Sequence, residues 1–348
     1  MTLWGGRFNQ SPAQSMRDLS RSVHFDWRLA PYEIEVNLVH LNNLIKQKIV
    51  TKSDGEILQK GLLDLAGEIG SGKFTYNHDD EDVHSAIERG LVEKCGPLGG
   101  AIRAGRSRND LVITDFKLYL VDHLLEIASA VTSLARSFNT QATNQIDVIA
   151  PGFTHTQHAQ PITFGQELSK HSHALLRDVD RIFDWIDRNN YSPFGAGALA
   201  GSSIQPEPEG TAAKLGFSGV MENSIDAVSD RDFAAEALFI MAMIGIHLSK
   251  IGEEFVLWSS TEFDWVEIDD AYATGSSIMP QKKNADVAEL ARGKSGRFIG
   301  NLTALLVVLK AMPFAYNRDL QEDKEPIFDS VDQLLILLPA ISGMVQTA

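Results

Sequence analysis

The chain has 348 residues, of which 44% are hydrophobic and 22% charged, an ordinary balance for a soluble protein with room for two domains. Its formal net charge of -15 at pH 7 repels phosphate backbones and anionic lipids, so nucleic acids and membrane surfaces are excluded as expected partners. The single cysteine, Cys95, excludes an intrachain disulfide, and we expect it to be a buried thiol in a reducing, cytoplasmic compartment.

The first part of the chain carries short helical patterns. Apolar residues recur every three or four positions from Ile34 to Ile45 and again from Leu58 to Ile69, which predicts two amphipathic helices. Ser53 and Glu56 fit a capping box at the start of the second helix. We therefore predict a small N-terminal helical domain over residues 1–105.

The remainder, residues 106–348, is dominated by long helical patterns. Between Arg106 and Ala150 there is neither glycine nor proline, and apolar residues at steps of three or four predict one very long helix. The same spacing predicts four more long helices, over 166–187, 232–258, 285–310 and from 326 to the end of the chain. Without a comparable set of strand patterns, the fold class is all-α, with a central bundle of long helices as the second domain.

The length and apolar character of these helices have two consequences. One small core cannot cover their apolar faces, so we expect equivalent helices of other copies to cover them in a homo-oligomer. The most apolar stretch, residues 234–248, contains Glu236 and is too short to cross a bilayer, so we expect no membrane span.

Five polar or glycine-rich segments interrupt the helical patterns. They are HDDEDVHSAIE (78–88), GRSRND (105–110), GFTHTQHAQP (152–161), GSSIMPQKKN (275–284) and YNRDLQEDKE (316–325). In the fourth, a flexible turn with Ser276 is followed by Lys282, Lys283 and Asn284. A loop with a serine, cations and an amide suits binding of a carboxylate and removal of a proton beside it. A solvated helix-capping loop with surface lysines is the alternative.

The GRSRND segment precedes the longest predicted helix. Arg106 and Arg108 suit bidentate binding of carboxylates, and Asn109 supplies an amide. Arginines are poor partners for a helix N-terminus, where the dipole is positive, which favours an anion site. The alternative is a structural cap formed by Ser107 or Asp110.

His155 lies in the polar GFTHTQHAQP segment between two predicted helices. A histidine there suits proton transfer near neutral pH, although a lone histidine is more often structural. A metal site is not predicted, because His171 and His173 are two positions apart and face differently on a helix. The histidines also lack a zinc-binding spacing.

Taken together, the segments resemble those of the fumarase/aspartase superfamily of elimination enzymes. GSSIMPQKKN is similar to the signature loop of that superfamily, and a THxQ segment followed by AQP is its usual companion. GRSRND, the QKKN ending and YNRDLQEDKE resemble argininosuccinate lyases in particular. The resemblance runs from WGGRF (4–8) to the end of the chain.

The sequence departs from that family in three places. The family reads THLQRAQP where this chain has Thr156 and His158, and Ala285 replaces the proline of KKNPD. Neither change removes a reactive group. The family also continues into a small C-terminal helical domain, which we expect to be missing from this chain.

The resemblance implies a lyase without cofactor or metal that cleaves the C–N bond of argininosuccinate by β-elimination. The products are fumarate and arginine, in the last step of arginine biosynthesis. Ser276 is then the general base, and Lys282 stabilises the charge that grows on the substrate carboxylate. His155 acts on the side of the leaving nitrogen and is oriented by Glu289. A serine serves as a base only where N–H groups and cations stabilise its alkoxide.

The resemblance also implies binding residues and an assembly. The substrate-binding residues are Ser22, Asp82, Arg108, Asn109, Thr154, Asn284, Tyr316, Gln321 and Lys324. The family forms homotetramers in which each active site draws motifs from three subunits. We therefore expect His155 and Ser276 of one chain to lie too far apart for a hydrogen bond.

Some of these residues have structural alternatives. Asp82 also fits an N-cap of the helix that follows it. Tyr316 and Gln321 are equally compatible with ordinary polar surface. Lys324, which lies among acidic residues, fits an exposed salt-bridge lysine.

Two other functions remain open. One is another elimination enzyme of the superfamily, such as adenylosuccinate lyase, fumarase or aspartase, against which GRSRND and QEDKE argue. The other is a non-catalytic structural protein like the δ-crystallins, relatives of which some have lost activity. Ser276, His155, Lys282, Asn284 and Asp82 are all present, which favours an active enzyme.

Overall fold

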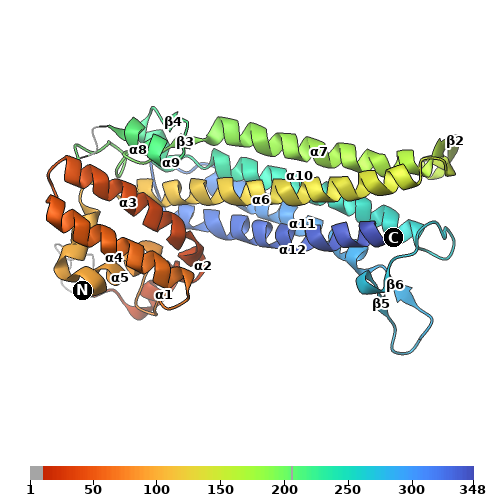
Figure 1. Cartoon of the computed structure of the whole chain (residues 1–348), viewed down its shortest axis with the longest axis horizontal. Helices are drawn as coiled ribbons and strands as arrows, with labels where there is room; N and C mark the ends of the chain where they lie inside the picture. The colour runs from red at the N-terminus through yellow and green to blue at the C-terminus, as the bar shows by residue number, and fades with distance from the viewer. Residues whose placement is uncertain (1–10, 205–206) are drawn as a thin grey trace. The chain divides into compact units, whose positions relative to one another are not determined.

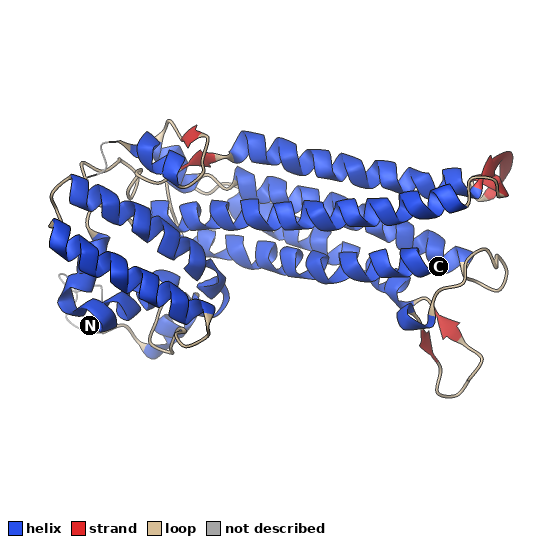
Figure 2. Ribbon diagram, viewed as in Figure 1, coloured by secondary structure: helices blue, strands red, loops and turns tan. Residues whose placement is uncertain are grey.

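The computed structural model describes residues 11–204 and 207–348, most of which are helical (Figure 1 and Figure 2). The predicted all-α fold class is confirmed. The described strands form three two-stranded ladders. The WGGRF segment at 4–8 lies outside the described residues.

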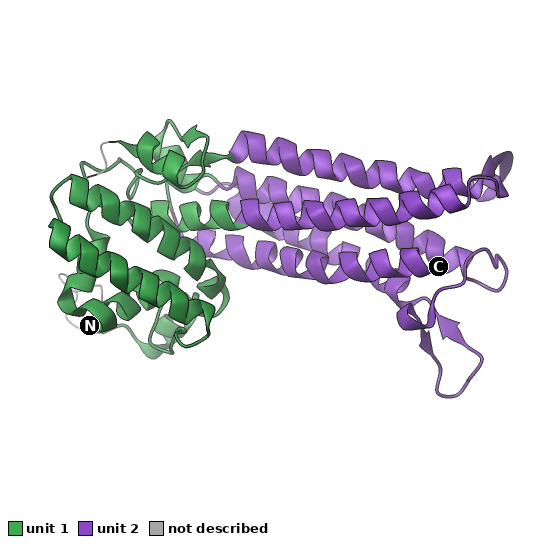
Figure 3. Cartoon of the chain, in the orientation of Figure 1, with its two compact units in different colours: residues 1–119, 190–230, 313–316 green, residues 120–189, 231–312, 317–348 purple. Residues whose placement is uncertain are grey.

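The chain forms two compact units, each assembled from separate stretches of sequence (Figure 3). Unit 1 contains residues 1–119, 190–230 and 313–316, and unit 2 contains residues 120–189, 231–312 and 317–348. The division between them falls inside the longest helix. The domain boundary between residues 105 and 106 stays a prediction.

Unit 1 gathers short helices around a shared core. Its elements are α1 (Gln14–Ser20), α2 (Val23–Asp26), η1 (Trp27–Leu29), α3 (Ala30–Lys46), α4 (Lys52–Gly70), α5 (Val83–Cys95), η2 (Gly96–Arg103), the first turns of α6 (Arg108–Asn144), β3 (Tyr191–Ser192), α8 (Pro208–Lys214), β4 (Gly219–Val220) and α9 (Ser224–Ser229). Val36 of α3 and Leu111 of α6 share one buried cluster with Phe194, Leu215 and Phe217. Apolar burial therefore joins the segment 190–230 to the N-terminal helices.

Unit 2 is a bundle of long helices. Its elements are the rest of α6, β1 (Ile149–Thr154), β2 (Gln157–Thr163), α7 (Phe164–Asn189), α10 (Asp232–Trp258), η3 (Asp270–Tyr272), β5 (Thr274–Gly275), β6 (Lys283–Asn284), α11 (Asp286–Leu309), η4 (Arg318–Asp323) and α12 (Lys324–Thr347). α10 packs against α7 and α11, and α11 packs against α12. Gly252 permits the close approach of α10 and α11, because a Cβ there would lie 2.3 Å from the carbonyl oxygen of Ala288.

The predicted long helices are confirmed. α10 has the predicted bounds, and α7, α11 and the start of α12 lie within two residues of the predicted ones. α6 ends at Asn144, and the chain then enters an antiparallel hairpin of β1 and β2. The GFTHTQHAQP segment is therefore part of a β-hairpin rather than an irregular loop.

Two local predictions were wrong. Thr51, not Ser53, is the N-cap of α4, and its hydroxyl accepts the backbone N–H of Asp54 at 3.1 Å. Thr51 has the extended backbone that an N-cap requires, whereas Ser53 already lies inside the helix. Cys95 is partly exposed rather than buried, and its thiol donates to the carbonyl of Ile57 at 3.6 Å.

Three helical stretches are long and apolar enough to cross a membrane by length and composition alone, namely α6, α10 and the stretch Arg318–Thr347. The sequence argument against a membrane span considered only residues 234–248 and was too narrow. Between 44% and 56% of the most apolar window of each stretch is buried within the chain. About half of each window is therefore not buried within the described chain.

Candidate active site

Ser22 precedes α2 and is tied to the N-terminus of α5 through Asp26. The Ser22 hydroxyl donates to Asp26 Oδ2 at 2.6 Å, and Asp26 Oδ1 accepts the backbone N–H of Val83 at 3.0 Å. The backbone N–H of Ser22 donates to the carbonyl of Glu81 at 2.8 Å. Ser22 and Asp26 are both buried. Asp26 therefore fixes the predicted binding serine beside the segment that carries Asp82.

Asp82 caps α5 and also binds Arg108. Its Oδ1 accepts the backbone N–H of Ser85 at 2.8 Å, and Ser85 Oγ accepts the backbone N–H of Asp82 at 3.0 Å, which completes a capping box. Asp82 Oδ2 accepts from Arg108 Nη1 at 2.6 Å. The N-cap alternative is confirmed, and the same carboxylate also orients one of the predicted substrate-binding arginines.

The GRSRND segment forms the start of α6. The backbone N–H of Ser107 donates to Asp110 Oδ1, and the backbone N–H of Asn109 donates to Ser107 Oγ, both at 3.2 Å. These bonds satisfy groups at the helix N-terminus, as the capping alternative predicted. The side chains of Arg108 and Asn109 take no part in this cap and instead contact Asp82 and the carbonyl of Ala198.

The side chains of Asn109 and Asp110 hold a glycine-rich loop in place. Asp110 Oδ2 accepts the backbone N–H groups of Gly195 and Gly197 at 3.0 and 2.9 Å, and Asn109 Nδ2 donates to the carbonyl of Ala198 at 3.1 Å. Burial raises the pKa of Asp110 to about 6, although these N–H groups partly counteract the rise. In this chain Asn109 therefore has a structural partner.

The loop that carries Ser276, residues 275–284 and hereafter the Ser276 loop, is closed at its base by the pairing of β5 with β6. Asp286, in the first turn of α11, accepts the backbone N–H of Thr274 at 3.1 Å and its hydroxyl at 2.5 Å. Asn284 Nδ2 lies 3.5 Å from Thr274 Oγ1. Together these contacts anchor the loop to α11.

The Ser276 hydroxyl oxygen faces backbone donors of its own loop. It accepts the N–H of Met279 at 3.2 Å and that of Ile278 at 3.4 Å. Ile278 itself is 83% exposed, so its side chain is left uncovered by the residues that the structure describes. The two N–H groups supply the kind of fixed positive partial charge that stabilises an oxyanion.

The two lysines of the Ser276 loop differ in their partners. Lys283 Nζ lies 2.7 Å from Asp270 Oδ1 and 3.4 Å from Glu267 Oε1. Within residues 11–204 and 207–348, the Lys282 ammonium forms no ion pair or hydrogen bond, and its side chain is exposed. Lys282 is therefore the loop cation that is not already neutralised.

His155 lies at the tip of the β1–β2 hairpin. Thr154 pairs with Gln157, and the two residues between them, His155 and Thr156, have φ of 54° and 57°. Consecutive left-handed residues form the tight turn that suits the twist of a two-residue hairpin, at a steric cost for a β-branched threonine. His155 is exposed at this turn.

An aromatic cluster holds the hairpin to the end of the bundle. Phe153 of β1 stacks against Phe263 and Trp265, with ring centroids 6.0 and 5.8 Å apart, and against His158 at 5.1 Å. The histidine that departs from the family pattern is thus a packing partner of the hairpin.

The structure brings together some of the predicted residues and separates others. The hairpin with His155 and the Ser276 loop lie at the same end of unit 2 but on different helices (Figure 1). No hydrogen bond joins His155 to Ser276 in the part of the chain that the structure describes, as predicted. Glu289, exposed in the first turn of α11, likewise has no hydrogen bond or ion pair to His155 among these residues.

The segment YNRDLQEDKE contributes buried charge. Lys324 is 5% exposed and donates to Asp323 Oδ1 at 2.6 Å, while Asp323 Oδ2 accepts from Arg231 Nε at 2.5 Å. The exposed salt-bridge alternative for Lys324 is therefore wrong, because η4 turns this residue toward the interior. Tyr316 and Gln321 are partly buried, in unit 1 and unit 2 respectively.

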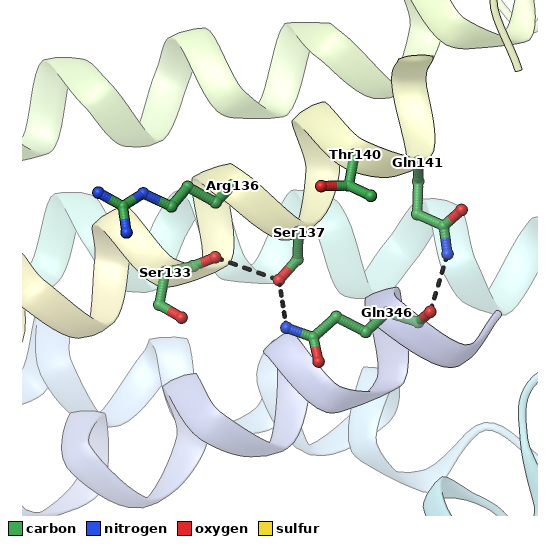
Figure 4. A pocket seen from close by; sticks show the side chains of 6 residues that line it. All are labelled: Ser133, Arg136, Ser137, Thr140, Gln141 and Gln346. Atoms are coloured by element: carbon green, nitrogen blue, oxygen red, sulfur yellow. Dashed lines mark hydrogen bonds between the residues drawn. The ribbon is translucent and has the colours of Figure 1, made fainter. Parts of the chain in front are cut away.

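A separate cavity of about 340 Å³ opens between α6 and α12 (Figure 4). It is lined by Ser133, Arg136, Ser137, Thr140, Gln141 and Gln346. Ser137 Oγ accepts from Gln346 Nε2 at 2.9 Å, and Gln141 Nε2 donates to the backbone carbonyl of Gln346 at 2.9 Å. None of these residues belongs to the predicted site, and their amides mainly secure the end of α12.

Proteins of known function are similar to the whole chain. Residues 6–300 match a family described as lyase. The chain is 56% identical to the argininosuccinate lyase of Frankia casuarinae, over all of this chain and 75% of that relative. It is 55% identical to the argininosuccinate lyase of Saccharopolyspora erythraea, over 99% of this chain and 72% of that one.

Solved structures share the fold. EDDS lyase, solved in complex with formate, is 30% identical with a TM-score of 0.81, over 95% of this chain and 65% of EDDS lyase. A fumarate lyase:delta crystallin from Brucella melitensis, 18% identical with a TM-score of 0.82, covers 98% of this chain and 78% of its own. At that identity the second likeness shows the fold alone. Through its sequence identity to these curated relatives, the chain belongs to the argininosuccinate lyase family.

Proposed function

We propose that this chain cleaves the C–N bond of argininosuccinate by β-elimination, with Ser276 as the general base. Family membership gives the reaction, which releases fumarate and arginine in arginine biosynthesis. The observation that carries the choice of base is the pair of backbone N–H groups at Ser276 Oγ. A serine hydroxyl is a poor base in water, and fixed donors of this kind lower the free energy of its alkoxide.

The first step removes a proton from the carbon beside a substrate carboxylate. Negative charge then grows on that carboxylate, and the barrier falls only if positive charge is already in place. Lys282 is proposed for this role because its ammonium extends from the Ser276 loop without an ion-pair partner in the described chain. Asn284, held near Thr274 at the base of the loop, contributes an amide donor.

The second step protonates the nitrogen that leaves. His155 is proposed to act on this side, because its tight turn holds an exposed imidazole at a fixed point on the hairpin. Glu289 is proposed to orient that imidazole and favour its protonated form, as a carboxylate commonly does for histidine. Since the two do not meet in one chain, the pair requires a second copy.

Substrate binding is proposed to rest on nine residues. The binding residues are Ser22, Asp82, Arg108, Asn109, Thr154, Asn284, Tyr316, Gln321 and Lys324. The hydrogen bonds of Ser22 and Asp82 support this, since they give neighbouring binding groups a fixed spacing before substrate arrives. Arg108 suits a substrate carboxylate because its planar guanidinium is built to donate two parallel hydrogen bonds, and Asp82 already orients it through Nη1.

The proposed assembly is a homotetramer in which three subunits complete each active site. The apolar windows of α6, α10 and the stretch 318–347 support it, because only about half of each is buried in one chain. We further propose that the enzyme is cytoplasmic and that it has no cofactor, no metal, no nucleic-acid partner and no membrane partner.

Enzyme assays with different substrates distinguish the proposed function from two alternatives. Adenylosuccinate lyase activity, and activity as a fumarase or aspartase, predict turnover of a different substrate in parallel reactions. A δ-crystallin-like structural role predicts no turnover of any of them. The anchored Ser276 loop favours an active enzyme, because a purely structural protein does not need a serine oxygen aimed at two N–H groups.

Replacement of Ser276 by alanine tests the proposal. We expect kcat for fumarate release, followed by ultraviolet absorbance, to fall by about 10²–10⁴-fold, the usual contribution of a general base. Helicity by circular dichroism and oligomeric state should be unchanged. The matched control is Ser277→Ala, since Ser277 is the exposed neighbour in the same loop. Near-normal turnover of Ser276→Ala would remove Ser276 as the base.

A further inference from the structure

A buried group of ionisable side chains in unit 1 has no place in the proposed chemistry. Glu33 of α3 and Asp115 of α6 are fully buried, and His84 of α5 is 6% exposed. One ligand-type atom from each lies within 4.8 Å of the others. These three helices are therefore pinned together by charge rather than by apolar contact alone, and buried charge is costly unless it is paired.

Glu33 is the hub of this group. His84 Nδ1 lies 2.5 Å from Glu33 Oε2, Asn37 Nδ2 donates to Glu33 Oε1 at 3.0 Å, and Arg106 Nη2 lies 3.7 Å from Glu33 Oε1. Burial alone would raise the pKa of Glu33, but the charge and hydrogen bond of His84, with the charge of Arg106, hold it well below its usual range. Glu33 is therefore a carboxylate.

Asp115 differs from the other members of the group in its lack of hydrogen-bond partners within the described chain. Both of its oxygens are buried, and neither accepts a hydrogen bond in the described chain. The nearest cationic atom, His84 Nδ1, is 3.9 Å away. Its neighbour is the carboxylate of Glu33, and two carboxylates have only acceptors to offer each other. Buried polar atoms without a partner are rare, so one of these groups carries a proton.

The direction of ionisation follows from the surroundings. Burial raises the pKa of Asp115 well above its ordinary value, and the negative charge of Glu33 raises it further. Burial would lower the pKa of His84, but the charge and hydrogen bond of Glu33 and the charge of Asp82 raise it. A neutral Asp115 beside the Glu33 carboxylate and a cationic His84 leaves each buried charge with an opposite partner.

Other charged groups also face this cluster. Asp26 of α2 adds negative charge near Asp115, and Arg106, in the segment before α6, adds positive charge. Arg108 of α6 opposes the charge of His84, and His40 of α3 lies near both Arg106 and Glu33. Burial lowers the pKa of His40 to about 4, so it adds no charge near neutral pH.

A bound divalent cation is the competing explanation for three such side chains. It fits the surroundings less well. Glu33 is already bonded to His84 and Asn37, and the Arg106 guanidinium, itself buried, would lie close to the ion. A proton satisfies Asp115 without placing a second cation beside Arg106.

We propose that Asp115 carries a carboxylic proton and donates it in a hydrogen bond to Glu33, and that Asp115, Glu33 and His84 position the binding residues of α5 and α6. His84 follows Val83, whose N–H is held by Asp26, the partner of Ser22. Asp115 lies two turns after Arg108 on the same face of α6, and Arg108 holds Asp82. The cluster thus fixes the positions of the helix ends at which Ser22, Asp82 and Arg108 lie.

The proton and the positioning role are tested separately, because only the second rests on the proposed lyase function. Asp115→Asn keeps the shape, the neutral charge and one N–H donor to Glu33. Asp115→Leu keeps the approximate shape but removes the donor. Infrared difference spectra of wild type against Asp115→Asn measure the carbonyl band of a buried carboxylic acid at neutral pH, without any need for activity. Its absence would overturn the assigned proton.

The kinetic arm compares the same two variants in the fumarate assay. We expect Asp115→Asn to keep KM within about twofold of wild type and Asp115→Leu to raise KM about tenfold with little change in kcat, as loss of one buried donor implies. Equal loss in both variants, together with activation of wild type but of neither variant by added Zn²⁺ or Mn²⁺, would show that a cation occupies the cluster. Wild-type KM in Asp115→Leu would remove the positioning role. No turnover in wild type would refute the lyase function and leave the infrared result standing.

Discussion

The two units differ in how much of the site a single chain completes. In unit 1, Ser22, Asp82 and Arg108 are fixed by hydrogen bonds to neighbouring elements and braced by a buried charge cluster. In unit 2, His155 and Lys282 are exposed, and their functional groups have no partner from the described chain. One region is assembled by folding, whereas the other presents reactive groups outward.

The difference has a physical origin. Buried charges such as Glu33 must be paired during folding, so the groups around them acquire a unique geometry. Exposed groups such as the Lys282 ammonium carry no such constraint, and we propose that another copy of the chain supplies their partners. The comparison supports the proposal that one chain fixes the binding groups of unit 1 and that the catalytic groups of unit 2 need a second copy.

The largest expected effect is complementation between inactive variants. It is the most direct test of whether His155 and Ser276 act from different chains. Ser276→Ala and His155→Asn should each lose turnover by about 10²–10⁴-fold. When the two variants are co-expressed or refolded together, mixed assemblies should regain activity, because some sites then receive both intact residues from different chains. Fumarate release by separately purified and mixed samples measures this. A mixture that stays at the level of its components would place both residues in one chain's site.

Replacement of Asp82 is expected to have an intermediate effect, and it tests the proposed binding residues of unit 1. Asn is as good an N-cap as Asp, so Asp82→Asn should keep α5 while weakening the hold on Arg108. We expect KM to rise about tenfold, the loss of one charge-assisted bond, with unchanged circular dichroism. Asp82→Ala is the control, which should also lower the free energy of unfolding by about 1 kcal/mol. Unchanged KM in both variants would contradict a binding role.

The pH dependence of stability tests the buried cluster on which the unit 1 half of the comparison rests. The raised pKa of Asp115 means that the folded chain retains a proton that the unfolded chain releases above pH 3.8. Stability from this group is therefore complete below pH 3.8 and declines as pH rises toward the folded pKa, by about 1.4 kcal/mol per pH unit. Asp115→Asn lacks this decline, so its advantage over wild type should grow with pH. Urea unfolding at several pH values measures it, and parallel curves would show that Asp115 is ionised when folded.

Much of the fold was readable from the sequence. The apolar spacing predicted α10 at its observed bounds because a helix of this length repeats its pattern many times. The capping residue of α4 was misplaced by two positions, since Thr51 and Ser53 are chemically equivalent caps and only backbone geometry distinguishes them. The β1–β2 hairpin was missed because its turn consists of His155 and Thr156 rather than the glycine or asparagine that signals such turns.

The candidate reactive residues were proposed from sequence, because GSSIMPQKKN and GRSRND are local patterns whose resemblance to a family needs no knowledge of contacts. The cluster of Glu33, His84 and Asp115 gave no such signal, since its members are 51 and 31 positions apart in sequence order and sit in ordinary helical patterns. Residue types and spacing alone thus determined the helices, and the resemblance of local motifs to a family indicated the elimination chemistry. Only tertiary packing decided which charges are buried, which are paired and which still face outward, because burial and pairing depend on distances between segments that the linear order does not contain.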